Sequence, residues 1–124
     1  MAVGDPIPPD RVIYRALNKK RMNEALTAPN EIAFLLKTAN GNYPDETHLS
    51  FGVSPAAAVA GLTNMRYICS IAVQDILRLD RHLLVTEDDD PQKVRVSGMP
   101  LITENEELSM AIAKDLLGIA RMCP

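Results

Sequence analysis

The residues best suited to chemistry lie in one short segment, His48-Leu49-Ser50, which runs into an alanine-rich stretch. Ser54 and Pro55 then fit the cap and the first turn of a helix, where the missing N–H of proline costs nothing. Such a junction presents backbone N–H groups to a ligand, although it also serves purely structural roles. We therefore take this segment as the first candidate binding site.

Three arginines could bring positive charge to that segment. Arg11 and Arg15 belong to a stretch rich in β-formers, and Arg66 begins a nearly continuous apolar run. Guanidinium groups bind phosphate strongly because they donate several hydrogen bonds in a fixed plane. If these arginines meet His48 and Ser50 in one cleft, we expect a nucleotide-binding site there.

Other charged and metal-binding patterns are weaker. The two histidines, His48 and His82, are far apart and have no second ligand nearby, so we predict no metal site. The acidic run 87–90 lacks the ligand spacing and glycine of a calcium loop, which favours a solvated turn over a weak cation site. The basic residues near the first strand favour an exposed helix face over a contact with phosphate or an acidic partner; they are Arg15, Lys19, Lys20 and Arg21.

Composition limits the class of protein. The net charge is −3 and the aromatic residues are three tyrosines and two phenylalanines, with no tryptophan. Both features argue against binding to nucleic acid by charge or by base stacking. The first residues show neither a basic start nor an apolar core of a signal peptide, and no apolar run could span a membrane. We therefore expect a cytoplasmic protein that does not contact membranes.

The elements that must position the candidate residues can be read from periodicity and turn residues. Residues 1–10 carry three prolines and predict an extended arm, followed by a single α+β domain over 11–124. Runs rich in β-formers or with alternating polarity predict strands; they cover 11–17, 48–53, 66–73, 82–86 and 93–97. Helices are expected at 18–26, 54–63 and 74–79, whereas 31–38 fits helix or strand and 39–47 reads as a polar loop.

The last third of the chain predicts a long helix. Thr103 and Glu106 have the spacing of a capping box, and apolar residues follow at helical intervals from Leu108 through Leu116 to Cys123. We expect this helix to pack on the sheet. The fold class is then α+β, with a single mixed or antiparallel sheet of four to five strands.

The order of these motifs resembles ADP-ribosyltransferase folds, and among them the RNA 2′-phosphotransferase type, which has a His-Leu-Ser motif. The resemblance implies that Arg11 or Arg15, with Arg66, would hold NAD or phosphates, and that His48 and Ser50 would position ribose. It also implies a carboxylate at the start of a late strand, where this chain has Pro91-Gln92-Lys93-Val94. NAD is expected as a cofactor, and nucleic acid as a partner, only under this interpretation.

The chain also resembles a family of small bacterial proteins of unknown function, common in cyanobacteria. The resemblance rests on an arginine-bearing first strand, Ala33-Phe34-Leu35, the Leu-Ser strand, and a late strand ending in Gly98-Met99-Pro100. We therefore expect a non-catalytic interaction or accessory module, with no cofactor, that binds a protein partner or itself. The alternative is an ADP-ribosyltransferase-like or RNA 2′-phosphotransferase-like enzyme, which could be degenerate.

Overall fold

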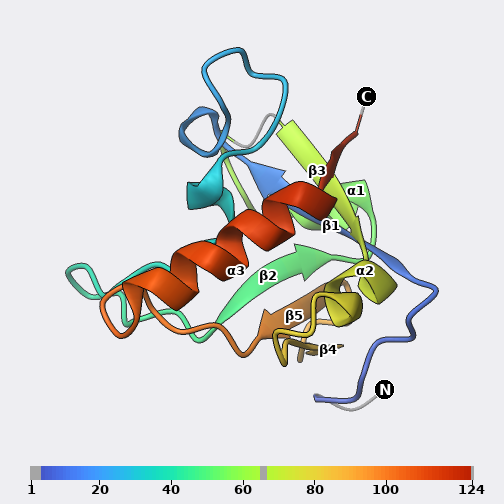
Figure 1. The fold of residues 1–124 in the computed structure, drawn as a ribbon. Helices are drawn as coiled ribbons and strands as arrows, with labels where there is room; N and C mark the ends of the chain where they lie inside the picture. Colours follow the sequence, from blue (N-terminus) through green and yellow to red (C-terminus); the bar gives the residue numbers. More distant parts are fainter. Residues whose placement is uncertain (1–3, 65–66, 124) are drawn as a thin grey trace.

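One six-stranded antiparallel sheet organises the molecule. The computed structural model describes residues 4–64 and 67–123. The strand order is β4-β5-β2-β1-β3-β6, so the first two strands of the chain lie near the middle (Figure 1). The strands span Val12–Leu17 (β1), His48–Gly52 (β2), Tyr67–Ala72 (β3), Leu84–Glu87 (β4), Lys93–Ser97 (β5) and Arg121–Met122 (β6).

Alternation along the strands gives the sheet a buried face and a more polar face. On β2, Leu49 and Phe51 are almost fully buried, whereas Ser50 between them is exposed. On β5, Val94 and Val96 are buried in the same way. This period of two is the pattern expected for strands that cover a core on one side only.

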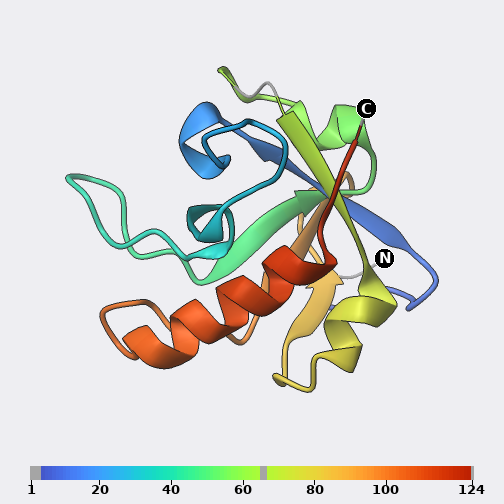
Figure 2. The same ribbon diagram turned by 45° about the horizontal axis from the view of Figure 1, so that its top comes forward.

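The C-terminal helix α3 (Glu106–Ile119) covers the buried face of the sheet. It lies along β2 in Figure 1, and Figure 2 shows the same helix beside the sheet from a second direction. Ile112, Ala113 and Leu116 are buried and belong to the same apolar cluster as the inward side chains of the strands. The prediction of an α+β fold with a C-terminal helix packed on the sheet is therefore confirmed.

The sheet has six strands, so the expected count of four to five is wrong. The extra strand, β6, follows directly after α3, where the predicted helical stripe was to continue as far as Cys123. The helix ends at Ile119 instead, and the N–H of Cys123 donates to the carbonyl of Ile68 on β3. Two residues are too short a strand to show a pattern in the sequence.

The predicted helix over 18–26 is reduced to the 3-10 turn η1 (Lys19–Arg21). The side chain of Asn23 accepts hydrogen bonds from the N–H groups of Thr27 and Ala28, and Leu26 takes a left-handed φ of 57°. Asparagine competes with a helix in this way, because its side chain offers the backbone other hydrogen bonds. The ambiguous segment that follows also forms a 3-10 turn, η2 (Glu31–Phe34), capped by the side chain of Asn30.

The remaining helices are short. Ser54 caps α1 (Pro55–Val59) as predicted, through a hydrogen bond from the N–H of Ala57, but the helix ends earlier than expected. Helix α2 (Val73–Arg78) continues directly from β3. The cap of α3 is Asn105 rather than Thr103, because Glu104 accepts from the N–H of Leu101 and closes a separate turn first.

The N-terminal arm pairs with the sheet. The N–H of Ile7 donates to the carbonyl of Val85, and the N–H of Glu87 donates to the carbonyl of Asp5. Pro6 lies opposite Thr86 in this short antiparallel bridge. The arm thus covers the outer edge of β4. No helix within 4–64 and 67–123 is long and apolar enough to cross a membrane.

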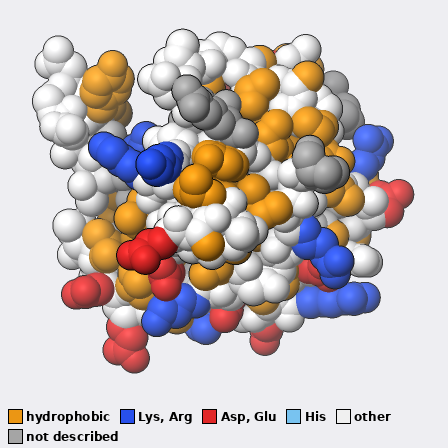
Figure 3. Space-filling model, turned by 90° about the horizontal axis from the view of Figure 1, so that it is seen from above, with side chains coloured by type: hydrophobic (Ala, Val, Ile, Leu, Met, Phe, Trp, Pro, Cys, Tyr) orange, Lys and Arg blue, Asp and Glu red, His pale blue; other side chains and the backbone are white. Residues whose placement is uncertain are grey.

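Part of the surface is apolar. Val53 and Leu62, which flank α1 in the chain, are each about half exposed. Figure 3 shows the molecule from above, with apolar side chains gathered near the middle of that face and charged side chains toward its rim.

Candidate functional site

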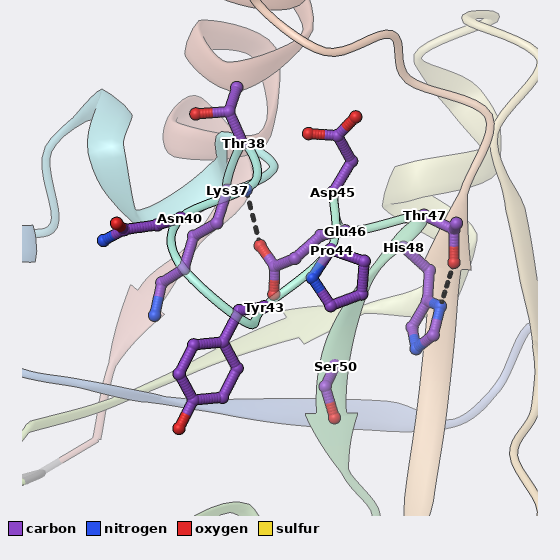
Figure 4. Close-up of a pocket in the computed structure, with 10 residues that line it drawn as sticks. All are labelled: Lys37, Thr38, Asn40, Tyr43, Pro44, Asp45, Glu46, Thr47, His48 and Ser50. Atoms are coloured by element: carbon purple, nitrogen blue, oxygen red, sulfur yellow. Dashed lines mark hydrogen bonds between the residues drawn. The ribbon is translucent and has the colours of Figure 1, made fainter.

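A polar cleft lies between the long loop before β2 and the first half of that strand. Its volume is about 580 Å³. We call it the loop cleft; it is lined by Lys37, Thr38, Asn40, Tyr43, Pro44, Asp45, Glu46, Thr47, His48 and Ser50. Figure 4 shows the loop residues around the opening, with His48 and Ser50 reaching it from β2.

The loop is held in shape by its own carboxylates. Glu46 Oε1 accepts from the N–H of Lys37 at 2.6 Å, and Asp45 Oδ1 accepts from the N–H of Ala39 at 2.6 Å. Both acids therefore hold the two sides of the loop together. A carboxylate with such partners contributes to the shape of the cleft, because its charge is already hydrogen-bonded to backbone donors.

Several cleft groups remain available to a ligand. Tyr43 is 78% exposed near the tip of the loop, and Lys37 is exposed beside it. On β2 the Ser50 hydroxyl is exposed, and His48 Nδ1 lies 3.0 Å from the hydroxyl of Thr47. An aromatic ring, an ammonium and hydroxyl groups in one cleft can stack on a flat ligand and bind its anionic and hydroxyl groups.

Arg15 contacts the same strand but from the buried side. Its Nε donates to the carbonyl of Ala33 at 2.7 Å, and its Nη1 donates to the carbonyl of Ser50 at 2.9 Å. The guanidinium also lies over the Phe51 ring, 5.7 Å from the ring centroid. Because Ser50 and Phe51 point to opposite faces, the strand backbone separates this guanidinium from the Ser50 hydroxyl.

The burial of Arg15 explains its electrostatics. Desolvation, together with the nearby charge of Arg21, lowers the pKa of Arg15 to about 10, while Glu46 acts in the opposite direction. The group therefore stays charged at neutral pH. Burial also lowers the pKa of Arg21. The predicted exposed basic face is wrong for these two arginines, whereas Lys19 and Lys20 are exposed.

The other candidate arginines do not line the loop cleft. Arg66 lies outside the described residues. Arg11 lines a separate cavity of about 220 Å³ between the N-terminal arm and the adjoining ends of β1, β4 and β5. We call this second cavity the arm pocket. Of the five predicted site residues, the structure places His48 and Ser50 in the loop cleft and Arg15 directly beneath it.

Arg95 is a charged neighbour of Ser50 that the sequence did not single out. It lies opposite Ser50 across the β2–β5 pair, and its Nη2 donates to Asp88 at 3.0 Å and to Asp89 at 2.8 Å. The predicted solvated turn forms at the exposed residues Asp89 and Asp90. Glu87, however, is a buried residue of β4, and Asp88 and Asp89 bind Arg95. Alternating polarity on β5 could have indicated that Arg95 shares the face of Ser50.

The hydrogen bonds also shift the ionisation of this cluster. Burial opposes the charged form of Asp88, but hydrogen bonds from Asp89 and Arg95 outweigh it and lower the pKa of Asp88 to about 2. The hydrogen bond with Asp88 is the largest cause that raises the pKa of Arg95. Both members of the pair are therefore charged at neutral pH.

The two cysteines are free. Cys69 is buried in the core, and desolvation raises its pKa to about 11, which makes its thiol unreactive at neutral pH. Within 4–64 and 67–123, no three His, Cys, Asp or Glu side chains are grouped so that they could hold a metal ion. Of the two cavities, the loop cleft is the larger, and its accessible groups are suited to hydrogen bonding and stacking.

Comparison with known proteins assigns no family. No family model, no curated protein and no solved structure matches this chain.

Proposed function

We propose that this protein is a non-catalytic binding module, and that the loop cleft takes a nucleotide. The observation that carries the proposal is the grouping of the exposed Tyr43 ring, the Lys37 ammonium and the Ser50 hydroxyl around one cleft of about 580 Å³. A ring can stack on a base, an ammonium can bind phosphate and a hydroxyl can bind ribose.

The carboxylates of the loop and the guanidinium of Arg15 favour binding over catalysis by these groups. The carboxylates of Asp45 and Glu46 each have an oxygen committed to loop N–H groups, and Arg15 is committed to two carbonyls. Such groups hold the cleft in shape. General acid–base catalysis needs a group that is free to exchange a proton with the substrate, with a suitable pKa.

Calorimetry with AMP and with NAD tests this proposal. We expect millimolar to high micromolar affinity, and Lys37→Ala and Tyr43→Ala should each weaken binding about five- to tenfold, since each loses one phosphate or stacking contact. Lys114→Ala, an exposed lysine on α3, is the matched control and should bind as the wild type does. The proposal is wrong if neither nucleotide binds at millimolar concentration, or if both cleft variants bind unchanged.

A second candidate is the ADP-ribosyltransferase-like enzyme. The observation in its favour is that the arginine strand β1, the His-Leu-Ser strand β2 and the late strand β5 are neighbours in the sheet. Against it, Lys93 stands opposite Gly52 near the start of β5, and its Nζ donates to the carbonyl of Ala57. A cation there cannot stabilise positive charge developing on ribose.

The two candidates differ in turnover. Wild-type protein incubated with NAD, alone and with RNA carrying a terminal phosphate, should release no nicotinamide and transfer no ADP-ribose. Release or transfer that Ser50→Ala abolishes would establish the enzyme instead of the binding module.

A further inference from the structure

The arm pocket differs from the loop cleft in the character of its walls. Its cavity of about 220 Å³ is bounded by apolar side chains of the arm and of two central strands, among them Ile7, Pro8, Ile13 and Val94. Ile13 and Val94 are almost fully buried, so the pocket reaches into the edge of the core. A small apolar group could fill this space and leave water.

One carboxylate in this pocket has no side-chain partner in the part of the chain that the structure describes. Glu87 is only 7% exposed, lies opposite Val94 across the β4–β5 pair and lines the cavity. No hydrogen bond or ion pair to its side chain is present among residues 4–64 and 67–123. The carboxylate is not sealed from the cavity, because the enclosed side-chain atoms that lack a partner among the described residues are Asn18 Oδ1 and Arg95 Nε. Such a group in an apolar pocket is therefore suited to a ligand that supplies a positive charge.

The other charged groups around the pocket are either committed or exposed. Asp88 and Asp89 bind Arg95 on the neighbouring strand. Lys93 Nζ donates to the carbonyl of Ala57 at 2.6 Å. Arg11 is exposed. Glu87 is therefore the buried charged group of the pocket that is available to a ligand.

We propose that the arm pocket binds a small organic cation, a primary ammonium carried on a short apolar chain, through the carboxylate of Glu87. The apolar walls would take the chain of the ligand, and the carboxylate would accept hydrogen bonds from the ammonium. This site is separate from the loop cleft and does not depend on nucleotide binding there.

The probe is n-butylammonium, titrated at constant ionic strength and followed by amide NMR shifts. We expect saturable shifts at Ile13 and Val94 with millimolar affinity, and at least about tenfold weaker binding of n-butanol, which has the same chain without the charge. The neutral probe separates the contribution of the carboxylate from that of the apolar walls. Equal binding of the two probes, or no shift at these residues, would overturn the proposal.

Two variants test the role of Glu87 further. Glu87→Gln keeps the shape of the side chain and should weaken butylammonium binding at least about tenfold, while Glu24→Gln, an exposed glutamate elsewhere, should leave it unchanged. Arg11→Gln removes from the lining of the pocket a positive charge that would repel the ammonium, so it should tighten binding up to a few-fold. Unchanged binding in Glu87→Gln, or weaker binding in Arg11→Gln, would contradict the proposed site. Thermal unfolding of each variant establishes that it is folded at the temperature of the titration.

Discussion

The loop cleft and the arm pocket each contain a glutamate, and they hold it in different ways. Glu46 in the loop cleft accepts a hydrogen bond from the N–H of Lys37, whereas buried Glu87 in the arm pocket has no side-chain partner among the described residues. The first carboxylate fixes a loop, and the second lines its cavity without such a hydrogen bond. The comparison teaches that a carboxylate lining a cavity indicates a ligand only when the protein has not already satisfied it.

The largest expected effect on stability comes from Arg15, which supports the loop cleft but not the arm pocket. Arg15→Met should lower the free energy of unfolding by about 3 kcal/mol, since it removes charged hydrogen bonds to two carbonyls. Amide NMR shifts should change around Ser50 and Ala33 and stay small at Ile7 and Glu87. Arg121→Met, which alters an exposed arginine, is the control and should change stability little. Equal disturbance of both cavities would show that Arg15 is not specific to the loop cleft.

A change at Gly52 should act near the arm pocket instead of the loop cleft. A Cβ added there would overlap the backbone of Ala58, so α1 must move away from the sheet. We expect Gly52→Ala to cost about 2 kcal/mol and to disturb the Lys93–Ala57 contact near the arm pocket. Chemical denaturation measures the cost. Gly118→Ala in α3 meets open space and should be neutral or stabilising, and a similar loss there would mean that packing against α1 is not the cause.

The glutamates themselves should respond with opposite signs. Glu46→Gln should lower stability by about 1 kcal/mol, because it replaces a charge-assisted hydrogen bond with a weaker one. Glu87→Gln should raise stability by about 1 kcal/mol, because a neutral amide costs less to bury than an unpaired carboxylate. Denaturant midpoints of the two variants decide the matter. The same sign for both would remove the contrast between the two cavities.

The smallest effect concerns pH. The pKa of Asp88 is lowered to about 2 in the folded protein, below the ordinary value near 3.8. Its contribution to stability is therefore complete above about pH 5 and is lost as the pH falls toward 2. Wild type should exceed Asp88→Asn in melting temperature at pH 5, and the difference should shrink by pH 2. A difference that is constant with pH would mean that the Asp88–Arg95 pair does not stabilise the fold.

The predictability of the fold follows from how local its determinants are. Strands β1, β2, β3 and β5 and helix α3 could be recognised because each carries enough alternating or helical apolar positions to show a period. The predicted helix over 18–26 does not form, because Asn23 and Asn30 make hydrogen bonds that only the folded chain reveals. Strand β6 is too short for a pattern, and pairing with β3 alone creates it.

For the candidate sites, too, local patterns could be predicted from the sequence, whereas contacts between distant segments could not. His48 and Ser50 share a cleft because alternation on one strand, which is visible in the sequence, puts them on one face. Arg15 was expected at a phosphate, yet it lies in the core, where the carbonyls of Ala33 and Ser50 bind it. Burial of an arginine depends on acceptors brought from distant segments, so the residue type alone could not reveal it.

The N-terminal arm has a consequence for the behaviour of the protein in concentrated solution. An open strand edge is a template on which further chains can add, and here the arm already occupies that place along β4. The arm in turn carries Pro6, Pro8 and Pro9, which lack the N–H groups that another strand would need. At the opposite margin, β6 offers only two residues. The sheet therefore ends on both sides in segments that discourage fibrous growth.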